Sequence, residues 1–324
     1  MPRVVATELA APTGFTTPTV LAHGPHRAAM SDLATLKEYQ AAAEEVARLA
    51  GKLIADAHEA RATSGLQIQS KGSATSVDLV TATDQAAEKL IIDTIRARYP
   101  DHAFIGEESA FAQGSAAPGS ASASASPPLA LGDAPTWIID PLDGTTNFVH
   151  GYPLVTVSIG VAVAKELAVG VIYNPLMDEL CSAVRGGGAT LNGRPCAVGA
   201  ASGVGDALIV NNVGASRKPG FNQLCTDRLL ALLDRNVRGL RNSGSAAQNM
   251  MHVACGRLDA YFEDGFGGPW DVAAGAVIVQ EAGGVVRMVK GEPFELRAGK
   301  GQVLCGNAAV VDDIAKVIRE VPER

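Results

Sequence analysis

The spacing of apolar residues divides the first part of the chain into two helices and two strands. Steps of three and four between apolar residues predict a long amphipathic helix over residues 31–62. A second helix is expected over residues 83–98, because Pro100 follows and cannot continue it. A short strand over 102–106 comes next, and the apolar run that leads to Asp140 predicts a buried strand.

From residue 155 onward the chain first contains several strands in succession and then alternates between strands and helices. Expected strands lie at 155–163, 168–175, 179–186, 207–212, 237–243, 258–263, 284–289 and 301–307, and expected helices at 221–235, 245–255, 271–282 and 308–321. Successive strands are typical of an antiparallel or mixed sheet, whereas alternation is typical of an α/β arrangement. We therefore expect one layered domain over residues 31–322, with an α+β half up to about residue 205 and an α/β half after it.

Two segments show neither pattern. Residues 1–30 contain a single acidic residue, several Pro and Gly and no period, which fits a disordered tail or a cleaved targeting segment. Residues 113–135 are rich in Ser, Ala and Pro. We expect a flexible surface loop there rather than a linker between domains, because strands resume on both sides.

Composition narrows the class of protein. The 324 residues are 47% hydrophobic and carry a formal net charge of −7, which argues against a uniformly basic nucleic-acid surface. No run of about 18 apolar residues is present, so we expect no membrane span. The five cysteines show no CxxC spacing, which indicates free thiols in a reducing compartment, and we assign none of them a role.

The stretch TWIIDPLDGTTNF, residues 136–148, places two carboxylates at the end of the buried strand. Asp140 and Asp143 are three residues apart across a turn that Pro141 initiates, so both can face one point. Two such carboxylates repel each other, which raises one pKa unless a divalent cation lies between them. The carbonyl oxygen of Leu142 is a further hard ligand. An ordinary turn with a helix-capping aspartate is the alternative interpretation of this segment taken alone.

Two further acidic segments favour a cation site over an ordinary turn. GEES, residues 106–109, puts Glu107 and Glu108 at a strand end, and GGPWDVAAG, residues 267–275, puts Asp271 in the first turn of a helix. Each segment alone is explained by an exposed acid pair or by helix capping. Together the three indicate a Mg²⁺ site, because oxygen ligands without a nearby histidine favour Mg²⁺ over Zn²⁺. A substrate phosphate commonly completes such a site, which predicts a phosphate ester as substrate.

The motifs GEES, WIIDPLDGTTNFVHG and WDVAAGAVIVQEAGG, together with VDLVTATDQAAEKLI at residues 77–91, resemble the inositol monophosphatase family. The resemblance covers residues 31–322, and the combination of motifs in this order is highly specific. It implies a layered αβαβα sandwich, a homodimer and a Mg²⁺-dependent phosphomonoesterase that Li⁺ inhibits. The segment YFEDGFGGPWD, residues 261–271, looks like the plant and algal branch, whose members hydrolyse inositol 1-phosphate and L-galactose 1-phosphate.

Carried over by matching position, the resemblance implies a role for each candidate site residue. One Mg²⁺ would be held by Glu107, Asp140 and the Leu142 carbonyl, a second by Asp140, Asp143 and Asp271, and a third, weaker one would lie near Glu107. Glu107 and Thr145 would position the attacking water, with Asp84 supporting Thr145. Substrate contacts would come from Asp143, Gly144, Thr145, Gly244, Ser245, Ala246, Glu263 and Asp271, and Lys71 would approach on a mobile loop.

Without the resemblance, some of these residues have ordinary explanations. Asp84 is then interpreted as a first-turn acid that complements the helix dipole, Ser245 as a helix-capping residue, and Glu263 and Lys71 as surface charges. Gly144 permits a tight turn, and backbone amides at the following helix start can cradle a phosphate.

The sequence as a whole predicts a Mg²⁺-dependent enzyme that hydrolyses myo-inositol monophosphate, L-galactose 1-phosphate or both. The alternatives are a related phosphatase for histidinol phosphate or nucleotide 3′-phosphates, and a catalytically silent regulator that binds metal or phosphate. The expected partner is a small phosphorylated polyol or sugar, with no nucleic acid and no membrane. The expected location is the cytoplasm, or the plastid if residues 1–30 are a transit peptide.

Overall fold

The structure of the chain is a computed structural model that describes residues 33–64, 68–70, 79–112, 127–214 and 216–322. The expected tail at 1–30 and Lys71 lie outside these residues, as does most of the loop expected at 113–135.

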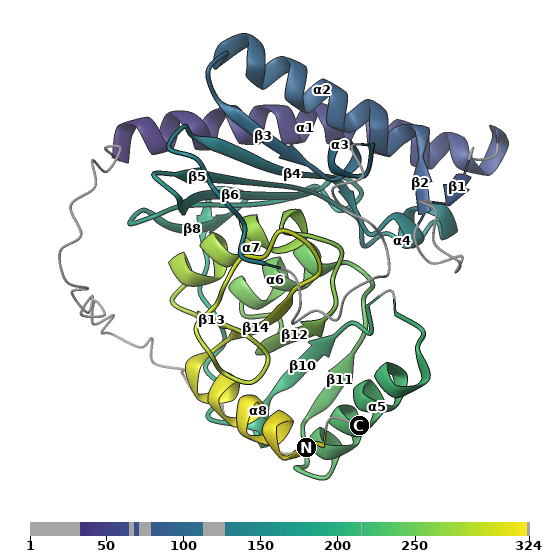
Figure 1. Cartoon of the computed structure of the whole chain (residues 1–324), viewed down its shortest axis with the longest axis vertical. Helices are drawn as coiled ribbons and strands as arrows, with labels where there is room; N and C mark the ends of the chain where they lie inside the picture. The colour runs from purple at the N-terminus through teal and green to yellow at the C-terminus, as the bar shows by residue number, and fades with distance from the viewer. Residues whose placement is uncertain (1–32, 65–67, 71–78, 113–126, 215, 323–324) are drawn as a thin grey trace, which may run out of the picture.

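Five layers of helices and sheets form the described part of the molecule (Figure 1). Helices α1 (Leu33–Ser64) and α2 (Ala82–Arg98) cover the outer face of a seven-stranded sheet. Helices α6 (Ala246–Ala254) and α7 (Trp270–Glu281) lie between this sheet and a five-stranded one, whose outer face α5 (Pro219–Leu233) and α8 (Ala308–Glu320) cover. This confirms the αβαβα sandwich.

The seven-stranded sheet follows the order of the chain. Its strands are β3 (Ala103–Gly106), β4 (Thr136–Asp143), β5 (Thr156–Val163), β6 (Glu166–Asn174), β7 (Glu179–Val184), β8 (Gly188–Leu191) and β9 (Arg194–Pro195). Only β3 and β4 are parallel, and every later pair is antiparallel. The last two strands were not expected, because four and two residues are too few to show a period.

The five-stranded sheet has the order β11-β10-β12-β14-β13. Its strands are β10 (Leu208–Asn211), β11 (Gly239–Arg241), β12 (Ala260–Asp264), β13 (Val285–Arg287) and β14 (Gln302–Gly306). Strands β10, β11 and β12 are parallel, as the alternation with helices indicates, and β14 runs antiparallel to its neighbours. Short elements complete the described chain: β1 (Ile68–Ser70), β2 (Leu79–Thr81), α3 (Glu107–Ala112), α4 (Thr145–His150) and the 3₁₀ turn Val204–Asp206.

A pair of glycines lets α7 lie very close to the seven-stranded sheet. Gly160 on β5 and Gly170 on β6 are direct partners in the register. A Cβ on Gly170 would lie 2.3 Å from the Ala274 carbonyl oxygen, and one on Gly160 would lie 2.8 Å from the Ala273 Cβ. Only glycine permits this approach. It brings the first turn of α7, which carries Asp271, to the ends of β4 and β5.

Residues 127–135, the described end of the loop expected over 113–135, pack onto the fold. Within its described end, Leu129 donates its amide to the Leu296 carbonyl at 2.8 Å, and Pro128 forms a β-bridge with Arg297. Leu129 and Leu131 pack against a cluster that contains the buried Trp270. Two leucines spaced for packing thus make residues 127–135 part of the fold, although the surrounding composition is that of a loop.

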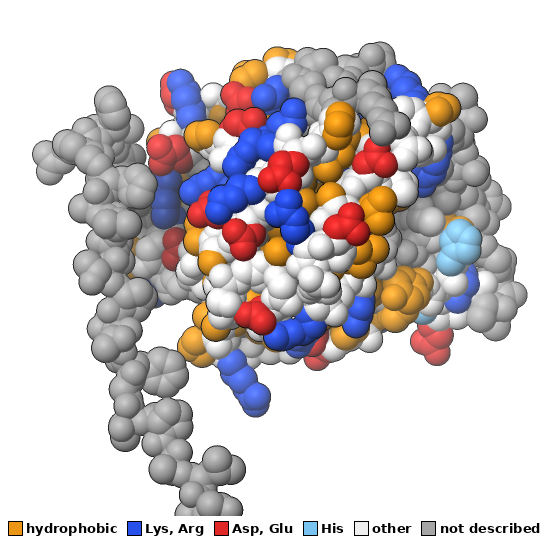
Figure 2. Space-filling view, turned by 90° about the horizontal axis from the view of Figure 1, so that it is seen from below, with side chains coloured by type: hydrophobic (Ala, Val, Ile, Leu, Met, Phe, Trp, Pro, Cys, Tyr) orange, Lys and Arg blue, Asp and Glu red, His pale blue; other side chains and the backbone are white. Residues whose placement is uncertain are grey.

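Charges of both signs are interspersed on the face of the molecule in Figure 2 rather than gathered into one basic field. Ion pairs such as Arg235 with Glu320 and Arg238 with Asp206 connect elements of the C-terminal half. In the part of the chain that the structure describes, no helix combines the length and the apolar character needed to cross a membrane.

Candidate active site

Strand β4 carries Asp140 and Asp143 and is buried along its whole length. The expected turn at Pro141 is instead a bulge within the strand: Asp140 pairs with Ser158 and Asp143 with Thr156, so β4 has one residue more than β5 over this interval. A bulge reverses the normal alternation of side chains, which lets Asp140 and Asp143 face the same side. The Leu142 amide donates to Asp140 Oδ1 at 3.1 Å and holds that carboxylate in place.

Gly144 turns the chain from β4 into the short helix α4. Its φ of +94° lies in the left-handed region, and a Cβ there would meet the Leu154 carbonyl oxygen at 2.8 Å, so both conformation and space require glycine. Thr145 follows, and its hydroxyl lies 3.1 Å from Asp84 Oδ1 and 3.2 Å from the Leu142 carbonyl oxygen. Asp84 is fully buried and also completes a capping box with Thr81 at the start of α2.

Asp271 joins the two acids of β4 from the first turn of α7. Its Oδ2 accepts a hydrogen bond from the Gly268 amide at 3.1 Å, and its carboxyl group also hydrogen-bonds to that of Asp140. Oxygen atoms of Asp140, Asp143 and Asp271 all lie within 4.8 Å of one another, and all three side chains are buried.

The N-terminus of α6 holds Asp143. Ser245 caps this helix by accepting from the Gln248 amide, as expected, and its hydroxyl also donates to Asp143 Oδ2 at 2.5 Å. The amides of Ala246 and Ala247 donate to the same carboxylate at 3.3 and 2.7 Å. A helix N-terminus stabilises negative charge, so α6 favours the ionised form of Asp143.

Glu107 approaches the cluster from the start of α3, a short helix that the sequence pattern does not predict. The short helix forms because the buried carboxylate of Glu88 accepts the amides of Glu108 and Ser109, both at 2.8 Å. Sequence reasoning missed Glu88. The available signal was its position four residues after Asp84, on the same face of α2 as the buried Ile91 and Ile95.

Glu263, the last but one residue of β12, is buried, so the interpretation as an ordinary surface acid is wrong. Tyr261 donates its hydroxyl to this carboxylate, and Asn212 also hydrogen-bonds to it. Burial raises the pKa of Glu263 to about 7. Asn212, also missed from the sequence, accepts the Gly244 amide at 3.1 Å and so connects Glu263 to the start of α6.

The electrostatics of the three clustered acids match a hard divalent cation. Burial and the negative charges of neighbouring acids, Glu107 among them, raise the pKa of Asp140 and Asp271 well above the usual value. Burial also raises the pKa of Asp143 to about 6, although α6 opposes the change. Buried carboxylates that repel one another are costly without a counter-charge, and oxygen-only donors suit Mg²⁺. The donor set therefore fits the metal that the resemblance implies.

The comparisons with known proteins agree with this geometry. The family model described as "Inositol monophosphatase family" matches residues 35–323. Inositol monophosphatase 3 of Solanum lycopersicum is 43% identical and covers 90% of this chain and 100% of its own length. Inositol monophosphatase 2 of the same plant is 44% identical, with coverages of 88% and 99%.

A solved structure extends the match to the fold. The extragenic suppressor protein suhB of Bartonella henselae superposes with a TM-score of 0.73 at 31% identity, covering 87% of this chain and 99% of that one. The family recognised from the motifs is confirmed, and plant members are among the relatives. This chain belongs to the inositol monophosphatase family and is a phosphatase.

Proposed function

We propose that this chain is a Mg²⁺-dependent phosphomonoesterase that hydrolyses myo-inositol monophosphate, with L-galactose 1-phosphate as a second substrate. The observation that carries the proposal is the buried cluster of Asp140, Asp143 and Asp271, whose oxygen atoms lie within 4.8 Å of one another. The names of the tomato relatives support the inositol substrate.

Two to three Mg²⁺ ions would be bound at this cluster. Glu107, Asp140 and the Leu142 carbonyl would hold one ion, and Asp140, Asp143 and Asp271 would hold another. A third, weaker ion would lie near Glu107. Bound cations would neutralise charge on the phosphate and supply Lewis acidity for an in-line displacement at phosphorus.

Side chains and backbone amides would align the attacking water with the substrate phosphate. Glu107 and the Thr145 hydroxyl would accept and orient the protons of the attacking water. Asp84 supports this role because its carboxylate lies 3.1 Å from the Thr145 hydroxyl and can hold it in one rotamer. The amides of Gly144 and Thr145 would bind phosphate oxygens.

The leaving-group hydroxyls would contact a second set of residues. Glu263 and Asp143 would accept from these hydroxyls, and the Gly244-Ser245-Ala246 segment would border them. The buried hydrogen bonds of Glu263 with Tyr261 and Asn212 support this assignment, because they hold the carboxylate in one orientation.

A glycine beside the acids supports the second substrate. Gly267 is exposed, and a Cβ on it would lie 3.2 Å from Asp271 Oδ2, so a side chain there would take space next to the cluster. Replacing Gly267 with leucine should lower the ratio of L-galactose 1-phosphate to inositol 1-phosphate turnover by about tenfold. The matched control is Gly205→Leu, since a Cβ at the exposed Gly205 meets nothing within 4 Å. An unchanged ratio in Gly267→Leu argues against the role of Gly267.

The first test is phosphate release from myo-inositol 1-phosphate, L-galactose 1-phosphate, histidinol phosphate and a nucleotide 3′,5′-bisphosphate, with Mg²⁺ and with chelator. We expect Mg²⁺-dependent turnover of the first two. Asp140→Asn should lower kcat by about 10³-fold or more, whereas the exposed Asp133→Asn should not change it.

Each other outcome of this assay identifies an alternative. Turnover of only the last two substrates identifies a related phosphatase. Mg²⁺ binding without turnover of any of them overturns the proposal in favour of a silent regulator.

Three further properties belong to the proposal. We expect a homodimer, which the molar mass in solution tests against twice the 33.3 kDa of one chain. We expect inhibition by Li⁺, measured as loss of turnover at fixed Mg²⁺. We expect a cytoplasmic location, and plastid import of a reporter fused to residues 1–30 contradicts it.

A further inference from the structure

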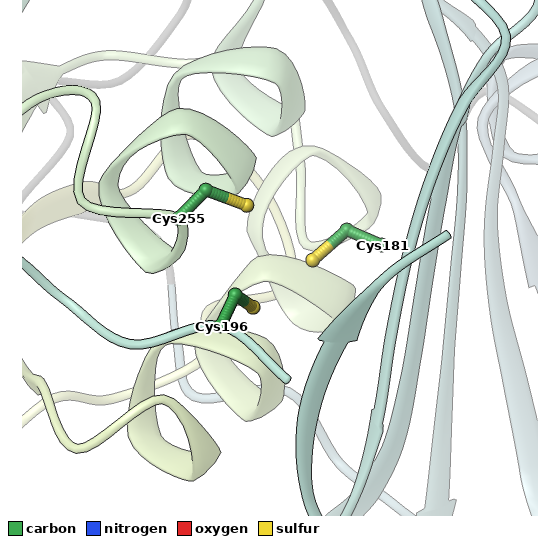
Figure 3. A group of neighbouring side chains, drawn as sticks. All are labelled: Cys181, Cys196 and Cys255. Atoms are coloured by element: carbon green, nitrogen blue, oxygen red, sulfur yellow. The ribbon is translucent and has the colours of Figure 1, made fainter. Parts of the chain in front are cut away.

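Three of the five cysteines meet at one point and form a group of their own, distinct from the group of Asp140, Asp143 and Asp271 (Figure 3). Cys181 lies on β7, Cys196 directly follows β9, and Cys255 is the C-terminal capping residue of α6. Their sulfur atoms lie within 4.8 Å of one another, and the side chains point toward a common centre. All three are free thiols.

We propose that Cys181, Cys196 and Cys255 form a binding site for a soft divalent cation of the Zn²⁺ class, separate from the Mg²⁺ site. Zinc–sulfur bonds of about 2.3 Å place three tetrahedral sulfurs roughly 3.8 Å apart, so sulfurs that lie within 4.8 Å of one another need to approach by at most about 1 Å. Thiolates prefer soft cations and carboxylates prefer Mg²⁺, which lets one chain bind both ions selectively.

The backbone holds the three sulfurs before any ion binds. Strand pairing fixes Cys181, the Cys196 amide donates to the Ala189 carbonyl at 3.0 Å, and the Cys255 amide donates to the Met251 carbonyl at 3.1 Å. Cys255 also lies at the C-terminal end of α6, where the helix dipole favours a cation.

A cation can reach the three thiols and displace their protons. Cys181 is fully buried, but Cys196 and Cys255 are partly exposed, so the site opens toward solvent. Each of the three thiols that ligates the cation releases one proton to solvent as its metal–sulfur bond forms, and no electron is transferred.

The side chains beside the cysteine cluster neither repel a bound cation nor fill its fourth ligand position. Arg257 is engaged by Glu179 through two hydrogen bonds of 2.6 Å, so its guanidinium is already neutralised. His252 contacts Gln248 at 2.7 Å and is not one of the clustered groups, which leaves water as the fourth ligand.

Cadmium is the probe for this site, because its thiolate complexes absorb in the near ultraviolet and its NMR shift reports the number of sulfur ligands. The test uses the full chain in saturating Mg²⁺ with a phosphine reductant. We expect one equivalent of Cd²⁺ to bind with a thiolate absorption and a three-sulfur NMR shift. Cys196→Ser and Cys255→Ser should each weaken binding by about 100-fold or more, whereas Cys225→Ser, on α5, should not.

Several results would overturn the proposal. They are no thiolate absorption in the wild-type protein, an absorption that the cluster variants leave unchanged, or a disulfide between two of the three cysteines that persists in the reductant. The variant Cys181→Ser would bury a hydroxyl and is not needed for this test. The NMR shift of Cd²⁺ in the wild-type protein already reports the number of sulfur ligands.

Discussion

The acidic residues of the candidate site differ from surface acids in their burial. Asp140 and Asp143 are buried among other acids, whereas Asp133 is almost fully exposed and pairs with Lys165 on the surface. Burial and the neighbouring acids raise the pKa of Asp140, and burial raises that of Asp143, so both need a proton or a cation to compensate.

The raised pKa of Glu263 makes the stability of the folded protein depend on pH. Its pKa is about 7 in the folded protein against 4.5 for the free side chain, so the folded state retains a proton between these values that the unfolded state releases. The contribution to stability is complete below about pH 4.5 and is lost as the pH rises through about 7. The loss is roughly 3 kcal/mol.

In chelator, the wild-type protein should therefore lose about 3 kcal/mol more unfolding free energy from about pH 4.5 to pH 8 than Glu263→Gln does. Urea unfolding at both pH values measures the difference. The exposed Glu166→Gln should behave like the wild-type protein. Equal losses in the wild-type protein and Glu263→Gln contradict the raised pKa.

At the scale of elements, the close packing of α7 on β5 and β6 positions Asp271. In Gly170→Ala the new Cβ would lie 2.3 Å from a backbone oxygen of α7, so the helix must move. We expect a destabilisation of about 1–3 kcal/mol and a lower kcat, measured by chemical unfolding and phosphate release. Gly205→Ala, which adds a Cβ in open space, should stay within about 0.5 kcal/mol. Wild-type kcat in Gly170→Ala would show that the exact position of α7 is not needed.

At the scale of the whole molecule, the acid cluster joins segments that are otherwise far apart in the chain. Strand β4 of one sheet and the central helices α6 and α7 meet there, so a bound cation should stabilise the entire fold. Mg²⁺ at about 100 times its Kd should add roughly 2.7 kcal/mol per site and raise Tm by at least about 5 °C.

Two variants test whether this shift in Tm comes from the acid cluster. Asp140→Asn should abolish the Mg²⁺-dependent shift and, in chelator, be more stable than the wild-type protein, because one repelling charge is gone. Asp133→Asn should keep the full shift. If Asp140→Asn shifts as much as the wild-type protein, Mg²⁺ binds elsewhere.

Most of the fold could be predicted from the sequence. The expected helix at 271–282 is observed at Trp270–Glu281, and the expected strand at 301–307 at Gln302–Gly306. The missed elements are too short to show a period, and some of them depend on distant partners. Helix α3, for example, begins where the Glu88 carboxylate accepts its first amides, and Glu88 is about 20 residues away in the chain.

The sequence by itself determined which acids stand at the ends of strands and at the starts of helices, because hydrophobic period and turn residues act over a few neighbouring positions. Those local signals were enough to propose a metal site at Asp140, Asp143 and Asp271. Only the tertiary structure decided which distant groups contact one another. It buried Glu263 and brought three cysteines from β7, the end of β9 and the end of α6 to one point, because sheet register and helix packing join positions that no local pattern connects.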